Sequence, residues 1–246
     1  MGYNWNWGIF FEKALFGSGT YLDLILSGLK WTVVVSLLAW IIAFSVGSVL
    51  GVLRTTSFAF ARAFATAYVE VFRNIPLLVQ MFIWYFVVPE LVPASLGQWM
   101  KTGMPMPEQS SAILCLGFYT ASRVAEQVRS GIQSIPKGQT YAAYAMGLTE
   151  AQAYRHVLLP MAYRIIIPPM TSEFLTIFKN SSVALTIGVL ELTAQSRQIT
   201  EYTFQGFEAF TAATVLYILI TMTVIVIMRY VEGKVRVPGY IGGGGR

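Results

Sequence analysis

The sequence has little charge for its length, and it contains one cysteine and one histidine. Only 12% of its 246 residues are charged, whereas 55% are hydrophobic, which is too apolar for a water-soluble domain of this size. The single Cys115 excludes an intrachain disulfide. The chain also lacks a G-x-x-x-x-G-K-[ST] phosphate loop and any Cys/His metal spacing. We therefore expect no ATP hydrolysis, no metal site and no cofactor in this chain.

Long apolar runs instead predict an all-α, polytopic membrane helical bundle with about five transmembrane helices. A span needs about 20 mostly apolar residues, and residues 29–53, 112–128 and 210–228 satisfy this requirement. Two further runs, 64–88 and 165–190, are interrupted by prolines and polar residues. Polar residues at membrane depth are tolerated only where they face protein or a water-filled path. We expect the two interrupted runs to line a pathway.

Basic residues predict the orientation, because cytoplasmic segments of membrane proteins carry an excess of Lys and Arg. With the N-terminus outside, the cytoplasmic segments hold Arg54, Arg62, Arg129, Lys137, Arg155, Arg164, Arg229, Lys234 and Arg236, and the outer segments hold Lys13, Lys30, Lys101 and Arg197. The net charge of +5 thus reports topology rather than a nucleic-acid partner. We expect an extracytoplasmic, interfacial segment at 1–26, a membrane domain at 27–231 and a cytoplasmic tail at 232–246.

A polar segment rich in small residues, 134–160, lies between two apolar runs, and we call it the docking loop. Its first part is compatible with a helix, Gly147 suits a left-handed C-terminal cap, and Thr149 with Gln152 can form a capping box. Small residues allow a partner to approach the backbone, and larger side chains can fill its pockets. The candidate contact residues are Tyr141, Ala142, Ala143, Tyr144, Gly147 and Leu148. DNA reading would require a free basic module, whereas this loop is tethered to apolar spans.

Charged residues form three groups in or beside the predicted spans. Glu70 and Arg73 are three residues apart and can neutralise each other, and Glu126 can pair with Arg123 or Arg129. For Glu70 with Arg73, and for Glu126 with Arg129, we favour structural ion pairs. The third group consists of Glu173, Lys179, Asn180, Ser181 and Ser182.

Arg123 lies one turn deeper than the Glu126–Arg129 pair, where its cost in a membrane requires an anionic partner. That partner is either Glu126 or the carboxylate of a substrate. Glu173 and Lys179 are six residues apart, which is a poor spacing for a pair on one helix, so we expect Lys179 to contact a neighbouring helix. The candidates for the substrate path are Arg123, Lys179, Asn180, Ser181 and Glu173.

The first span carries small residues at every fourth position, Ala43, Gly47 and Gly51. Such a stripe allows helices to pack closely, either within one chain or between chains.

These motifs resemble a known family. The spacing from Ala142 through Gly147 to Pro160 is similar to the EAA loop of permease subunits from ATP-binding-cassette importers. Residues 70–80, 125–139 and 168–184 are similar to stretches of the permeases that import polar amino acids. One departure is Tyr141, which stands where that family usually has a glutamate, so an acidic contact is missing or is replaced by an aromatic one.

The resemblance implies a type I ABC importer permease fold in the bacterial inner membrane, in contact with lipid, and transport by alternating access. It further implies a separate ATPase dimer that binds ATP and Mg, a second permease subunit of the same or a different sequence, and an extracytoplasmic amino-acid-binding protein. The docking loop would be the cytoplasmic coupling helix. Arg123 and the N-terminal stretch 4–10 direct the resemblance toward permeases for glutamate and aspartate.

Three alternatives remain at the level of sequence. One is a permease for another polar amino acid such as glutamine. Another is a self-sufficient ion-coupled carrier, although such carriers commonly have paired internal repeats, which this chain lacks. A membrane enzyme would need a nucleophile with its base or a metal cluster, and the sequence offers neither.

Overall fold

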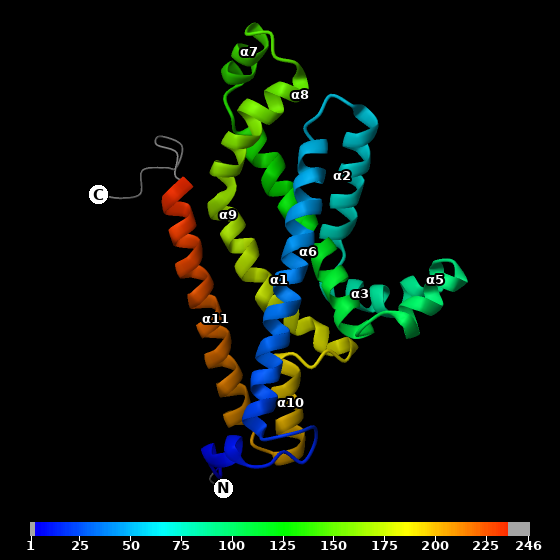
Figure 1. Cartoon of the computed structure of the whole chain (residues 1–246), viewed down its shortest axis with the longest axis vertical. Coiled ribbons are helices and arrows are strands. Elements are labelled where there is room, and N and C mark those ends of the chain that lie inside the picture. The colour runs from blue at the N-terminus through cyan, green and yellow to red at the C-terminus, as the bar shows by residue number, and fades with distance from the viewer. Residues whose placement is uncertain (1–2, 236–246) are drawn as a thin grey trace. The chain divides into compact units, whose positions relative to one another are not determined.

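The computed structural model describes residues 3–235, which form helices and no strand (Figure 1). The long helices are α1 (Tyr21–Leu53), α2 (Ala59–Asn74), α6 (Pro107–Gln133), α9 (Leu159–Asn180), α10 (Leu192–Thr203) and α11 (Gly206–Val235). The shorter elements are η1 (Trp7–Phe11), α3 (Leu77–Phe82), η2 (Ile83–Val87), α4 (Val88–Leu91), α5 (Ala94–Gln98), η3 (Trp99–Gly103), α7 (Lys137–Ala145), α8 (Glu150–Ala153), η4 (Tyr154–Leu158) and η5 (Ser181–Ile187). The all-α prediction is confirmed. Residues 236–246 of the expected cytoplasmic tail lie outside the described residues.

By length and composition, two of the described helices can cross a membrane, namely α1 and α11. Two interrupted pairs, Ala59–Asn74 with Leu77–Leu91 and Glu150–Ile187 with Leu192–Thr203, raise the number of candidate spans to four. The remaining expected span falls within α6. This helix has 27 residues, which is long enough to cross a bilayer, but it also carries the charged residues considered below.

Prolines and glycine determine where the interrupted helices end. Ile75 takes an extended conformation before Pro76, which begins α3 as its N-terminal cap, because the ring of a proline disfavours the helical conformation of the residue before it. By contrast, α9 continues through Pro168 and Pro169. Its α-helical part ends at Asn180, and η5 follows from Ser181 to Ile187. Gly188, with φ +92°, caps the end of η5. The expected span 165–190 therefore changes helix type in its last third.

The described chain divides into two compact units, each with its own core. Unit 1 comprises residues 3–41, 76–117 and 176–223. Its core contains Ile9, Tyr21, Leu24, Ile25, Leu192, Ile199, Ala209 and Ala213. The N-terminal segment contributes Ile9 to this core, and the backbone N–H of Asn6 donates to Glu208 of α11 over 2.7 Å. The aromatic rings Trp5, Trp7 and Phe11 remain exposed.

Unit 2 comprises residues 42–75, 118–175 and 224–235. Leu50, Ala65, Val69 and Ala125 form its core cluster. The small-residue stripe of α1 packs within the chain: a Cβ added at Gly47 would lie 2.6 Å from Cβ of Val124, and one added at Gly51 would lie 2.6 Å from Cβ of Val128. These glycines therefore allow α1 and α6 to approach closely.

Candidate translocation and coupling sites

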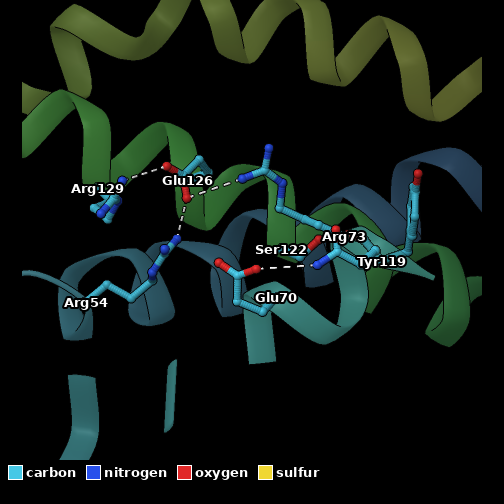
Figure 2. A network of polar contacts seen from close by, with 8 residues as sticks. Arg54, Glu70, Arg73, Tyr119, Ser122, Glu126 and Arg129 are labelled. Atoms are coloured by element: carbon cyan, nitrogen blue, oxygen red, sulfur yellow. Dashed lines mark hydrogen bonds and ion pairs between the residues drawn. The ribbon is translucent and has the colours of Figure 1, made fainter. Parts of the chain in front are cut away.

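Three arginines of unit 2 surround one carboxylate, that of Glu126 on α6 (Figure 2). Arg54 forms an ion pair with Oε2 of Glu126 and is almost fully buried. Nη1 of Arg73, from α2, lies 3.4 Å from the same oxygen. Arg129 donates to Oε1 over 3.0 Å. We call these four residues the Glu126 cluster. It joins the end of α1 to α2 and α6, and it carries more positive than negative charge.

The Glu126 cluster contains the expected contact between Glu126 and Arg129, but the expected pair of Glu70 with Arg73 is wrong. Glu70 accepts a hydrogen bond from the side chain of Asn74 over 3.4 Å, while Arg73 points toward Glu126 (Figure 2). The sequence rule considers only neighbours on one helix. In the folded chain, Glu126 interacts with the buried Arg54, and the side chain of Arg73 extends from α2 to the same carboxylate instead of pairing with Glu70.

Arg123 lies in a separate arrangement in unit 2. Its Nη2 donates to the hydroxyl of Tyr119 over 2.9 Å, and the guanidinium carbon lies 5.3 Å from the centre of that ring, within the range of a cation–π contact. Nη1 lies 4.0 Å from Oε2 of Glu173 on α9, and the two side chains are 41% and 15% exposed. At 4.0 Å this contact is an ion pair without a hydrogen bond.

The anionic neighbour of Arg123 is therefore Glu173 rather than Glu126, which corrects one of the two alternatives taken from the sequence. Oε2 of Glu173 is buried and has no hydrogen-bond partner. Most N–H groups of the exposed guanidinium are also free of protein acceptors within the described residues. The pair thus presents unsatisfied donors next to an unsatisfied acceptor.

The other candidates for the substrate path belong to unit 1, at the change from α9 to η5. Ser181 is buried, and its hydroxyl donates to the carbonyl of Phe178 over 2.8 Å. Asn180 is half-buried. Lys179 is exposed, and its ammonium group forms no ion pair or hydrogen bond within the described residues. Its expected contact with a neighbouring helix stays a prediction. The carbonyl of Lys179 accepts from Ser182 over 2.7 Å.

The docking loop folds as its local sequence predicts. Gly147 adopts φ +83° directly after α7, and the capping box between Thr149 and Gln152 has both of its hydrogen bonds. Tyr141, Ala142, Tyr144 and Gly147 are exposed, and Leu148 is half-buried. Ala143 is only 1% exposed, so it packs inside the loop and is not available to a partner, unlike its expected role.

Two hydrogen-bonded contacts hold the docking loop to the connection between α1 and α2. The hydroxyl of Ser57 donates to Glu150 over 2.9 Å, and the hydroxyl of Tyr154 donates to the carbonyl of Thr55 over 2.7 Å. All four residues belong to unit 2. A displacement of α7 and α8 can therefore be transmitted to the connection that leads from α1 into α2.

Sequence reasoning missed two participants of these sites. Arg54 counted only as a basic residue of a loop, yet it is the most buried member of the Glu126 cluster. Tyr119 was overlooked, although its position one turn before Arg123 places its hydroxyl within reach of the guanidinium. The position of Arg54, directly after a long apolar run, could have indicated that its side chain is buried.

Comparison with known proteins agrees with this architecture. Residues 43–237 match the family described as binding-protein-dependent transport system inner membrane component. The glutamate/aspartate import permease protein GltJ of Escherichia coli (strain K12) is 52% identical over 99% of this chain and 100% of its own length. The glutamate/aspartate import permease protein GltK of Escherichia coli O6:H1 is 30% identical over 87% of this chain and 94% of its own length.

A solved structure, the crystal structure of an amino acid ABC transporter with histidines, superposes with a TM-score of 0.74 at 30% sequence identity. The superposition covers 87% of this chain and 95% of that chain. The family match spans most of the sequence, and the fold, the docking loop and the membrane-spanning helices are in accord with it. This chain belongs to the family of inner membrane components of binding-protein-dependent transport systems.

Proposed function

We propose that this chain is the permease subunit of an ATP-driven importer that moves glutamate and aspartate across the inner membrane by alternating access. Its 52% identity to a relative named as a glutamate/aspartate import permease supports this substrate class. The chain is a transport subunit and not an enzyme, so the energy comes from ATP hydrolysed, with Mg, by a separate ATPase dimer.

The observation that carries the substrate assignment is the partly exposed guanidinium of Arg123. A carboxylate can accept two parallel, charge-assisted hydrogen bonds from such a group. Tyr119 uses one of its nitrogens and Glu173 stands at 4.0 Å from another, so donors remain for a ligand. An acidic side chain passing this position would gain these bonds, whereas the neutral amide of glutamine would gain weaker ones.

Glu173 completes this proposed site. Its buried oxygen without a hydrogen-bond partner suits the ammonium group that every amino acid substrate carries. Arg123 and Glu173 together would then bind groups of opposite charge on one zwitterionic substrate. Lys179, Asn180 and Ser181, which belong to unit 1, are also proposed as residues that contact the substrate during transport.

The docking loop is proposed to receive the ATPase through Tyr141, Ala142, Tyr144, Gly147 and Leu148. Its hydrogen bonds to the connection between α1 and α2 support this role, because they offer a route by which movement of α7 reaches the membrane helices. Two relatives, GltJ and GltK, are both named as glutamate/aspartate import permeases, but they are 52% and 30% identical to this chain. This difference favours a partner permease of different sequence. An extracytoplasmic binding protein would deliver the substrate to the side where the N-terminus lies.

Uptake by an Arg123→Gln variant, reconstituted with its partners, tests the substrate assignment. Losing the charge-assisted hydrogen bonds, worth about 1.5–3 kcal/mol each, should reduce glutamate uptake by at least about tenfold. Uptake of glutamine, supplied through a binding protein suited to it, should change little. Arg229→Gln removes the same charge from an exposed residue of α11, outside the site and outside the docking loop, and serves as the matched control.

An equal loss for both substrates would contradict the proposed contact. Arg123 would then act only as a structural partner of Glu173. A complex that fails to assemble would also show that Arg123 is a structural partner of Glu173, because removing one member of a structural pair leaves the other charge unpaired. Size-exclusion chromatography before the uptake assay distinguishes a loss of assembly from a loss of transport.

A further inference from the structure

Unit 2 contains a second polar site, which the proposed translocation path does not use. A cavity of about 680 Å³ lies between the connection from α1 to α2, the end of α6 and the docking loop. Its walls include the cationic side chains of Arg54, Arg62 and Lys137 and one carboxylate, that of Glu150. Cavities lined by charges of one sign concentrate ions of the opposite sign, so this cavity should attract anions.

The only carboxylate of the described lining does not neutralise these cations. Glu150 accepts one hydrogen bond from the hydroxyl of Ser57 over 2.9 Å and another from its backbone N–H over 3.4 Å. It forms no ion pair within residues 3–235. Arg62 donates to the carbonyl of Thr56 over 3.4 Å, which leaves its other N–H groups available.

Arg54 supplies the second line of evidence. The residue is only 8% exposed, and its Nε is buried without any hydrogen-bond partner, although its Nη1 binds Glu126. A buried donor without an acceptor carries a desolvation cost, and such donors in native proteins require an explanation. Arg54 also lines the cavity, so an anion there would add a second counter-charge beside its guanidinium, although the buried Nε itself is closed to the cavity.

The docking loop provides donors from the opposite wall. Lys137, the first residue of α7, and Thr140, one turn later, line the cavity. Neither side chain has a hydrogen bond or an ion pair within the part of the chain that the structure describes. The two walls therefore offer cationic and hydroxyl groups to the same space. One wall contributes Arg54, directly after α1, and Arg62 of α2, and the other contributes Lys137 and Thr140 of α7.

We infer that this cavity binds a small oxyanion of the phosphate or carboxylate type, which links the docking loop to the connection between α1 and α2. Arginine forks match the planar or tetrahedral oxygens of such groups, and lysine adds a point charge. Because the donors come from both walls, a bound anion restrains α7. The occupancy of the site would then regulate how far the docking loop can move.

Titration with inorganic phosphate tests this inference. The full-length chain is purified with its partner permease in nanodiscs of zwitterionic lipid, without the ATPase, whose nucleotide sites bind phosphate themselves. Binding is measured by isothermal titration calorimetry. Replacing Arg62 and Lys137 together by glutamine should weaken phosphate binding by at least about tenfold. Arg229→Gln, which removes an equivalent exposed charge from α11, outside the cavity and the docking loop, should change it less than about twofold.

Hydrogen exchange locates the bound anion independently. Phosphate should slow amide exchange in α7 of the wild-type protein and should leave exchange in the Arg62→Gln/Lys137→Gln variant unchanged. Arg123→Gln, which alters only the proposed substrate site, should bind phosphate as the wild type does, so this inference and the substrate assignment can fail separately.

The source of the anion is distinguished by repeating the titration with nanodiscs that contain phosphatidylglycerol. Competition by this lipid in the wild type assigns the site to a lipid headgroup, and an unchanged affinity assigns it to a free anion such as phosphate or L-glutamate. Equal phosphate binding by wild type and double variant, or no binding by either, would overturn the inference.

Discussion

At the scale of single residues, the Glu126 cluster removes charged groups from water. The ion pairs between its members offset the cost of this desolvation. Arg54 is the critical member, since its side chain is 6% exposed and it reaches Glu126 across 72 positions of sequence. Breaking a buried pair by removing one partner is more damaging than replacing both partners, because the remaining charge stays buried. The cluster is therefore expected to respond unequally to the loss of its different members.

Glu126→Gln should destabilise the protein by about 3 kcal/mol, because it leaves Arg54 buried without a counter-charge. Arg73→Gln removes a half-exposed partner at 3.4 Å and should cost less than about 1 kcal/mol. Thermal unfolding of the detergent-solubilised variants measures both values. A double variant, Glu126→Leu with Arg54→Met, should regain part of the lost stability, and equal effects of the two single substitutions would refute this account.

At the scale of elements, a substitution at Gly147 can test whether the docking loop contacts a partner without removing any packing contact of the loop itself. An added Cβ at this position would meet no atom within 4 Å, whereas its φ of +83° disfavours most side chains. Asparagine tolerates this conformation better than other residues do. A large side chain here should therefore affect a docked partner more than the loop itself.

We expect Gly147→Trp to reduce transport by at least about tenfold in the assembled importer and Gly147→Asn to retain most of it. Both variants should insert into the membrane to similar levels, because Gly147 lies outside the apolar spans and an added Cβ there meets no atom within 4 Å. Uptake by proteoliposomes, normalised to the amount of inserted protein, is the measurement. Normal transport by the tryptophan variant would exclude close backbone approach at this position.

The contact between α1 and α6 provides a second test at this scale. In Gly51→Ala, the new Cβ would lie 2.6 Å from Cβ of Val128 and 2.7 Å from the carbonyl oxygen of Ala125. Such overpacking should lower the stability by about 1–3 kcal/mol. Gly233→Ala, in α11, adds the same atom where nothing lies within 4 Å, and the higher helix propensity of alanine should leave it neutral or slightly stabilised. Similar melting temperatures for both variants would contradict the predicted clash.

These elements also indicate which features could be predicted from the sequence. The docking loop was predictable because its cap at Gly147 and its capping box at Thr149 depend on residues within one turn. The partner of Arg123 was not, because Glu173 is fifty positions away and becomes a neighbour only when α6 and α9 pack. The same limit explains the wrong assignment of Arg73, whose local partner Glu70 satisfied the spacing rule while Glu126 attracted it in the folded chain.

At the scale of the whole molecule, coupling requires that the docking loop and the substrate enter from opposite sides of the membrane. The loop joins α6 to α9 and is held to the connection between α1 and α2. If this connection is cytoplasmic, an ATPase that displaces α7 can act on α1, α2, α6 and α9 at once. If it is external, neither the proposed ATPase contact nor the anion site can meet its ligand from the cytoplasm.

Cysteine labelling decides between these orientations. The chain has one cysteine, Cys115, which is fully buried and can be replaced by alanine to give a background without thiols. In that background, Lys137→Cys in the docking loop should react with a membrane-impermeant maleimide only after the cytoplasmic side is opened. Lys101→Cys, at the exposed end of η3, should react from outside in intact cells. This expectation follows from the distribution of basic residues alone, since positive charge is retained on the cytoplasmic side.

Both variants should label equally in detergent, which controls for accessibility. The reverse pattern would place the docking loop outside, and coupling through α7 would then be impossible.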